Sequence, residues 1–116
     1  MSANIEFELR DRVRIAHISG DFDITQAGVL REQLLGAVRN DDLALVVDLT
    51  HARYVDSVGV SLLFELAERV VGRQLRFAVV FPPDGLIERV LTIVDLGSVA
   101  EVYSSLDDAL TAMRHA

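Results

Sequence analysis

The fold is decided by the stretch LVVDLTHARYVDSVGVSLLFEL, residues 45–66. It opens with an apolar, β-branched run, which is typical of a strand buried on both faces. Asp48 and the polar residues after it predict a turn, and an apolar pair returns at Tyr54-Val55. Asp56-Ser57-Val58-Gly59 then stands directly before a helical pattern. A hydroxyl is therefore expected where a helix begins.

The residues before this stretch predict a hairpin and a helix. Residues 5–9 alternate between apolar and charged, as in a half-buried strand, and the alternation resumes at Val13 after a break. The second strand is expected to end at Gly20. Asp23-Ile24-Thr25-Gln26 resembles a capping box and predicts a helix to about Val38. The apolar stripe of this helix is Leu30, Leu34, Leu35 and Val38.

The remaining elements alternate between strand and helix. The pattern predicts a strand over 43–49, a helix over 57–71, a strand over 75–80, a helix from Pro82-Pro83-Asp84 to about Val94, a strand over 99–103, and a last helix capped by Ser104 or Ser105. The order β-β-α-β-α-β-α-β-α predicts an α/β fold. We expect a mixed, mostly parallel sheet of four to five strands, with an antiparallel N-terminal hairpin and about four helices.

Composition narrows the possible partners. The 116 residues fit one domain, and a net charge of −7 disfavours a nucleic-acid partner. There is no cysteine, and the three histidines (His17, His51, His115) are too scattered to suggest a metal site. The N-terminus does not resemble a signal peptide, and no apolar run approaches the ~18 residues of a membrane span. We expect a soluble cytoplasmic domain without a cofactor or a membrane partner.

Asp21-Phe22-Asp23-Ile24-Thr25 matches the D-x-D-x-T nucleophile loop of haloacid-dehalogenase-type phosphatases. Those enzymes need a lysine to neutralise the phosphoryl oxygens, and all eleven basic residues here are arginine. The missing lysine also argues against a receiver-type phosphoaspartate domain, and the P-loop motif is absent. We therefore interpret this segment as the end of a strand followed by a helix cap.

Two further catalytic interpretations are weak. The segment 59–63 has half of a G-x-S-x-G elbow without its second glycine, and Ser61 falls one turn inside a predicted helix. His17 is expected to be an ordinary strand residue and His51 a solvated turn residue, neither with an evident partner. By helix chemistry alone, Asp56 or Ser57 is simply the N-cap of the helix that follows.

Taken together, these motifs resemble the STAS domain of bacterial anti-sigma factor antagonists. That family has an apolar strand, D-L-[ST], a short turn, an apolar or aromatic pair, and D-S-[ST]-G-[LVA] at a helix start. The matching segments are Val46-Val47-Asp48-Leu49-Thr50, Tyr54-Val55 and Asp56-Ser57-Val58-Gly59-Val60. A second family block corresponds to Ile18-Ser19-Gly20-Asp21-Phe22-Asp23, and the segments 85–91, 102–103 and 106–110 are also similar to the family.

The resemblance implies a phosphorylation-switched binding protein and not an enzyme, with one STAS domain over residues 1–116. In that family a GHKL-type serine kinase, which is also the anti-sigma factor, phosphorylates the serine of the D-S loop, and a PP2C-type phosphatase reverses this. The unphosphorylated antagonist binds the kinase and releases the sigma factor. By position, Ser57 is the expected phosphorylation site, and the partner-binding residues are Asp23, Asp56, Ser57, Val58 and Gly59. A monomer or weak homodimer is expected.

This chain departs from the family motif in one place, because Val58 stands where a second hydroxyl often follows the serine. Ser57 is then the one acceptor in the loop. A phosphate there is expected to meet unsatisfied amides and the positive end of the helix dipole, worth ~0.3–1 kcal/mol. It would also add about −1.5 to −2 charges beside Asp56, a cost for any partner docked over the loop.

STAS domains have other roles, which remain alternatives. Some are subunits of phospholipid-transporting ABC systems that dock on the ATPase, and others are cytoplasmic tails of anion transporters. The tail would need a membrane part, which this sequence does not contain. The intact Asp56-Ser57 pair favours the sigma-factor pathway over the ABC subunit.

Overall fold

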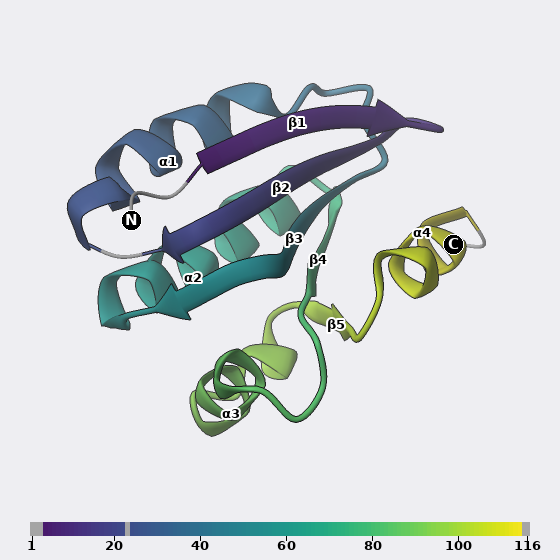
Figure 1. The fold of residues 1–116 in the computed structure, drawn as a ribbon. Helices are drawn as coiled ribbons and strands as arrows, with labels where there is room; N and C mark the ends of the chain where they lie inside the picture. The colour runs from purple at the N-terminus through teal and green to yellow at the C-terminus, as the bar shows by residue number, and fades with distance from the viewer. Residues whose placement is uncertain (1–3, 23, 115–116) are drawn as a thin grey trace.

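A computed structural model of the chain describes residues 4–22 and 24–114 (Figure 1). The strands are β1 (Asn4–Arg10), β2 (Val13–Phe22), β3 (Ala44–Val55), β4 (Arg76–Val80) and β5 (Glu101–Tyr103). The helices are α1 (Ile24–Ala37), α2 (Ser57–Gly72), α3 (Leu86–Ile93) and α4 (Leu106–Arg114), with a 3₁₀ helix, η1, at Leu96–Ser98. The predicted order of elements is confirmed.

The five strands form one sheet in the order β1-β2-β3-β4-β5. Strand β1 pairs antiparallel with β2, and the other neighbours are parallel, as predicted. The β1–β2 hairpin turns through Asp11 and Arg12, both with positive φ (52° and 65°). A two-residue loop with both residues left-handed suits the twist of a hairpin, although it is usually built from Asn-Gly or Asp-Gly. The hairpin predicted from the alternation is confirmed, but without one of these pairs the sequence did not fix the type of its turn.

The turn predicted after Asp48 is wrong, because β3 continues without a break to Val55. Its pairing with β2 shifts twice, between the pairs His17↔Asp48 and Ser19↔His51 and again between Gly20 and Asp21. Each shift places one extra residue in β3, as a β-bulge does. On the face of β3 that meets helices α1 and α2, the core positions are Leu45, Val47, Leu49, Ala52 and Val55, so their spacing changes from two residues to three. Because the alternation of apolar and polar residues is interrupted here, the sequence pattern indicated a turn where the strand in fact continues.

The predicted end of β2 at Gly20 is also wrong, since the strand extends to Phe22. Gly20 has a φ of 83°, a left-handed value that glycine adopts readily, and it lies at the second register shift. The glycine thus marks a bulge and not the end of the strand. The extension carries β2 far enough to meet the residues just before α2.

The sheet is covered on both faces. The larger core lies against α1, α2 and α3. It includes the predicted stripe residues Leu30 and Leu34 of α1 and Val38, one residue past the end of α1, with Leu35 partly buried beside them. It also includes Leu62, Leu63, Leu66 and Val70 of α2. The smaller core lies against α4 and consists of Val13, Ile15, Ala44, Val46, Ala78, Val80, Ala109, Leu110 and Met113. This arrangement fixes α2 firmly by its buried face, so its first turn is held at one end of the sheet.

The predicted start is wrong for α3 and confirmed for α4. The segment Pro82-Pro83-Asp84 precedes α3 and is not part of it, because α3 begins at Leu86 and Asp84 has a φ of 63°. The last helix begins as one of the two predicted alternatives, since the Ser105 hydroxyl accepts a hydrogen bond from the Asp108 amide at 3.1 Å. Within the residues that the structure describes, no helix is long and apolar enough to cross a membrane.

Candidate functional site: the Asp56-Ser57 turn

The start of α2 lies at the ends of two parallel strands. Phe22 and Val55 are paired at the ends of β2 and β3, and α2 begins two residues after Val55 (Figure 1). The Asp56 amide donates to the Phe22 carbonyl at 3.3 Å, which ties the turn to the last residue of β2. Carboxyl ends of parallel strands meet at one edge of a sheet, where ligand-binding residues commonly gather.

Asp56 is the N-cap of α2, which decides between the two alternatives left by the sequence. Its Oδ1 accepts from the amides of Val58 at 3.0 Å and Gly59 at 2.9 Å, while its carbonyl accepts from Val60 at 2.9 Å. Ser57 is therefore the first helical residue, and its side chain is exposed. Since the carboxylate does the capping, the Ser57 hydroxyl is not needed to begin the helix.

The same bonds revise one expectation about a phosphate on Ser57. The amides of Val58 and Gly59, which such a phosphate was expected to meet, already donate to the carboxylate of Asp56. A phosphate would retain the favourable end of the helix dipole but would have to compete with a negative neighbour for these donors. Its main effect would fall on the surface charge of the turn and not on the stability of the helix.

Gly59 allows α2 to lie against the end of β2. A Cβ at this position would lie 2.4 Å from the Phe22 carbonyl oxygen and 3.3 Å from a methyl carbon of Val55. The nearest atom belongs to the backbone, which cannot rotate away. Gly59 is buried and Val58 is half-buried, so Ser57 is the exposed residue of these three.

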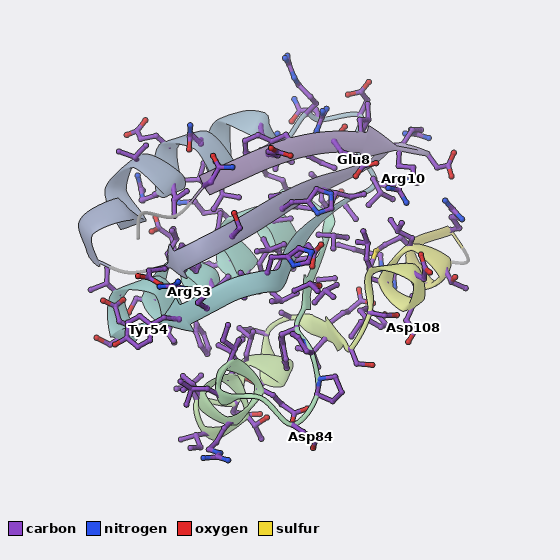
Figure 2. All side chains as sticks on the ribbon, viewed as in Figure 1. Glu8, Arg10, Arg53, Tyr54, Asp84 and Asp108 are labelled. Atoms are coloured by element: carbon purple, nitrogen blue, oxygen red, sulfur yellow. The ribbon has the colours of Figure 1, made fainter. Side chains whose placement is uncertain are left out.

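The surface beside the turn is mixed in charge. Asp21, at the end of β2, lies 3.6 Å from the Arg53 guanidinium. Arg53 and Tyr54 are exposed near the end of β3, and Figure 2 shows them beside the first turn of α2. The predicted partner-binding residues Asp56, Ser57, Val58 and Gly59 are brought together here. Asp23, the fifth of them, lies outside the described residues.

The Asp56 cap has a testable effect on stability. Asp56→Ala removes the acceptor of two amide hydrogen bonds and is expected to lower the free energy of unfolding by about 1 kcal/mol, with an upper range near 2 kcal/mol. Urea unfolding followed by circular dichroism measures the change. Asp56→Asn keeps a capping oxygen and should remain close to the wild type. Equal stability of the alanine variant and the wild type would show that the cap is unimportant.

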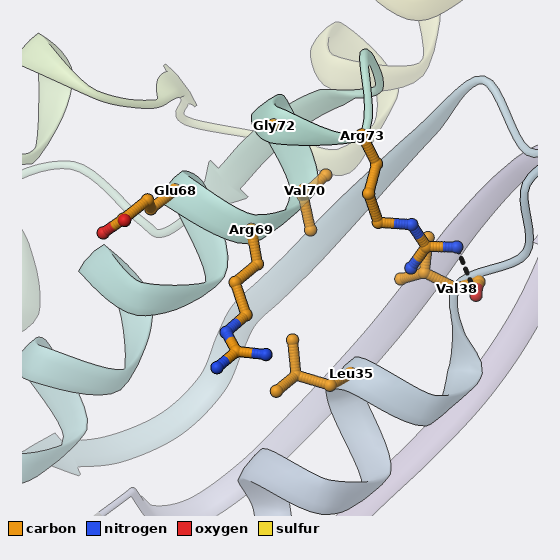
Figure 3. Close-up of a pocket in the computed structure, with 7 residues that line it drawn as sticks. All are labelled: Leu35, Val38, Glu68, Arg69, Val70, Gly72 and Arg73. Atoms are coloured by element: carbon orange, nitrogen blue, oxygen red, sulfur yellow. Dashed lines mark hydrogen bonds between the residues drawn. The ribbon is translucent and has the colours of Figure 1, made fainter.

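A hollow of about 430 Å³ lies at the other end of α2, between it and the end of α1 (Figure 3). Arg73 donates to the Val38 carbonyl at 3.2 Å and to Asn40 Oδ1 at 2.8 Å. The last carbonyls of a helix lack partners within the helix, and a basic side chain satisfies one here. The hollow lies beside this contact between two helix ends, and we assign it no ligand.

A polar network on the sheet was not predicted from the sequence. His17 was expected to lack a partner, but its Nδ1 lies 2.8 Å from Asp48 Oδ2 and its Nε2 lies 2.7 Å from Glu8 Oε1. His51 is an exposed residue of β3 and not a turn residue. Asp48 interrupts the apolar run of residues 44–49, and a buried carboxylate requires hydrogen-bond donors. That rule was the available signal that a partner such as His17 existed.

Comparisons with known proteins agree with this geometry. The STAS domain family matches residues 4–109. The anti-sigma-F factor antagonist RsfB of Mycobacterium tuberculosis is 30% identical over 102 residues, which cover 88% of this chain and 82% of the relative. A crystal structure of an anti-sigma factor antagonist from Mycobacterium paratuberculosis aligns with a TM-score of 0.87 and 30% identity, covering 97% of this chain and 95% of the other.

A more distant structure shares the fold. The Bacillus cell fate determinant SpoIIAA, solved in its phosphorylated form, aligns with a TM-score of 0.68 at 16% identity, covering 94% of this chain and 98% of the other. The five-stranded sheet with its antiparallel first pair is thus the architecture of these relatives as well. On the match of residues 4–109 and the identity to RsfB, the chain belongs to the STAS domain family.

Proposed function

We propose that this protein is an anti-sigma factor antagonist whose binding is switched by phosphorylation of Ser57. When unphosphorylated, it binds an anti-sigma factor that is also a GHKL-type serine kinase, and the sigma factor is released. The observation that carries the proposal is the position of Ser57, exposed at the first residue of α2 with the capping role taken by Asp56. The similarity to RsfB, an anti-sigma-F factor antagonist, supports the class of partner.

The exposed hydroxyl suits a residue that another protein modifies. Among the residues that the structure describes, the Ser57 side chain has no hydrogen-bonded base, so the proposal assigns the base and the ATP site to the kinase. A PP2C-type phosphatase would reverse the modification. Because the proposed kinase and sigma factor act inside the cell, the proposal places the protein in the cytoplasm, as a monomer or weak homodimer.

Phosphorylation is expected to change the partner surface and leave the fold intact. The helix start does not depend on Ser57, whereas a phosphate adds about −1.5 to −2 charges next to the Asp56 carboxylate. A partner docked over the turn would have to desolvate this charge or oppose it with new cations. The relative SpoIIAA, whose structure is known in unphosphorylated and phosphorylated forms, supports the idea that this fold tolerates the modification.

The phosphorylation site can be tested with two serines on the same helix. Ser57→Ala should abolish phosphate incorporation when the protein is incubated with ATP and the GHKL kinases encoded near its gene. Ser61→Ala, a change of the same kind at an exposed position one turn later, should leave incorporation unchanged. Mass mapping of the wild type should place the phosphate on Ser57. Undiminished incorporation in Ser57→Ala would refute the assignment.

The class of partner is tested separately by a pull-down with the wild-type protein. Recovery of a GHKL kinase is the expected result. Recovery of an ABC ATPase in its place would favour the alternative of a subunit in a phospholipid-transporting system.

A further inference from the structure

A histidine links three neighbouring strands of the sheet. Glu8 lies on β1, His17 on β2 and Asp48 on β3, and the two ring nitrogens of His17 lie 2.7 Å from Glu8 Oε1 and 2.8 Å from Asp48 Oδ2. Strand β1 is at the edge of the sheet, and β2 is its one neighbour among the strands that the structure describes. The histidine therefore connects the edge strand to the third strand through side chains, across the strand between them.

The geometry requires a protonated ring. An ionised carboxylate only accepts hydrogen bonds, so both nitrogens of His17 must donate, and only the imidazolium has two N–H groups. Each carboxylate is held by a further donor. Arg10 donates to Glu8 Oε2 at 2.6 Å, and the Thr50 amide donates to Asp48 Oδ1 at 3.0 Å. These donors keep both carboxylates ionised and facing the histidine.

The pKa directions agree with this arrangement. Partial burial alone lowers the pKa of His17, but the hydrogen bonds to Glu8 and Asp48 outweigh it and raise the pKa above its ordinary value. Hydrogen bonds from His17 and Arg10 lower the pKa of Glu8. Burial raises the pKa of Asp48, but the bonds from Thr50 and His17 dominate and lower it.

The charges around His17 are mostly negative. On β1, Glu6 is opposite His17 in the ladder, Glu8 contacts it, and Arg10 is already bound to Glu8. On β3, Asp48 contacts the ring. His51 of β3 and Glu6 of β1 line a small hollow of about 170 Å³ together with His17. Loss of the His17 proton would leave the carboxylates of both neighbouring strands without the cation between them, and one ring nitrogen would face a carboxylate without a donor.

Apart from the contact with His17, the side chains of β1 make few buried apolar contacts. None of its residues is fully buried, and its large apolar side chains Phe7 and Leu9 are 39% and 53% exposed. Ile5 is partly buried against the larger core. Segments with few buried apolar contacts open locally at low free-energy cost, so a single polar link can decide whether they stay closed.

We propose that protonated His17 is a clasp that holds the edge strand β1 on the sheet, and that its deprotonation loosens β1 while the rest of the domain stays folded. Because the folded pKa of His17 is raised, the clasp is complete below the ordinary histidine value of about 6.5 and is lost as the pH rises through the folded value. The lowered carboxylate pKa values keep Glu8 and Asp48 ionised throughout that range.

Amide hydrogen exchange by NMR, corrected for the intrinsic effect of pH, tests the clasp on the whole protein. As the pH rises through the titration of His17, protection of the β1–β2 ladder should fall, and protection of the β3–β4 ladder should not. His17→Gln should have low β1 protection at every pH, with no step. His51→Gln, a matched change at a neighbouring exposed position, should behave as the wild type.

Glu8→Gln provides a second measurement that does not remove the histidine. With one anionic partner replaced by a neutral amide, the NMR titration of His17 should move to lower pH, and the fall in β1 protection should move with it. A β1 protection that does not depend on pH in the wild type would overturn the proposal. So would an unchanged pH step in His17→Gln, or a His17 titration that is the same in Glu8→Gln and the wild type.

Discussion

Gly59→Ala is expected to lower the free energy of unfolding by about 2–4 kcal/mol. The new methyl group would lie 2.4 Å from the Phe22 carbonyl oxygen, far inside the contact distance. Relief of this clash requires α2 to move away from β2, and overpacking of this kind costs about 1–3 kcal/mol. The same movement would break the bond from the Asp56 amide to the Phe22 carbonyl, worth about 1 kcal/mol more.

Chemical denaturation of the two proteins measures this difference, and Gly28→Ala provides the control. Gly28 is an exposed residue within α1, and an added Cβ there would meet nothing within 4 Å. Alanine is favoured over glycine in a helix by about 1 kcal/mol, so the control should be as stable as the wild type or more stable. If Gly59→Ala is no less stable than the wild type, α2 does not pack as closely on β2 as the 2.4 Å distance requires.

The elements of the fold were largely predictable because their apolar residues recur with the period of a helix or strand. The stripe of Leu62, Leu66 and Val70 on α2 is one such case, and all three are buried. The length of β3 was not predictable in this way. Its bulges after Asp48 change the spacing of buried residues, and a bulge depends on the pairing with β2, which a local pattern does not contain.

The sequence predicted where the candidate site lies but not which residue caps the helix there. The Asp56-Ser57 pair before an amphipathic helix indicated a cap, and either side chain could have supplied the oxygen. The structure shows that Asp56 does so, which makes Ser57 the exposed residue. The hydrogen-bond partners of His17 could not be predicted from the sequence for another reason. Glu8 and Asp48 are 9 and 31 residues away in sequence, and only the sheet brings them together.

Ser57→Glu should imitate the proposed phosphorylated form and weaken binding to the proposed anti-sigma partner. The new carboxylate would lie next to Asp56, whose Oδ1 already accepts from the amides of Val58 and Gly59. Because those donors are in use, the added charge would remain exposed to the partner and would not be neutralised within the helix. Like charges at an interface cost up to several kcal/mol, and desolvation adds to this cost.

The dissociation constant is therefore expected to rise about ten- to hundredfold, which corresponds to about 1.4–2.8 kcal/mol. Isothermal titration with the purified kinase that is proposed as the partner, in the absence of ATP, measures it directly. Thr111→Glu adds the same charge at an exposed position of α4, on the opposite face of the sheet from α2, and should leave binding unchanged. Equal weakening by both variants would mean that net charge controls the affinity. Weaker binding of Ser57→Glu alone, with its free energy of unfolding equal to that of the wild type, would place the partner over the first turn of α2.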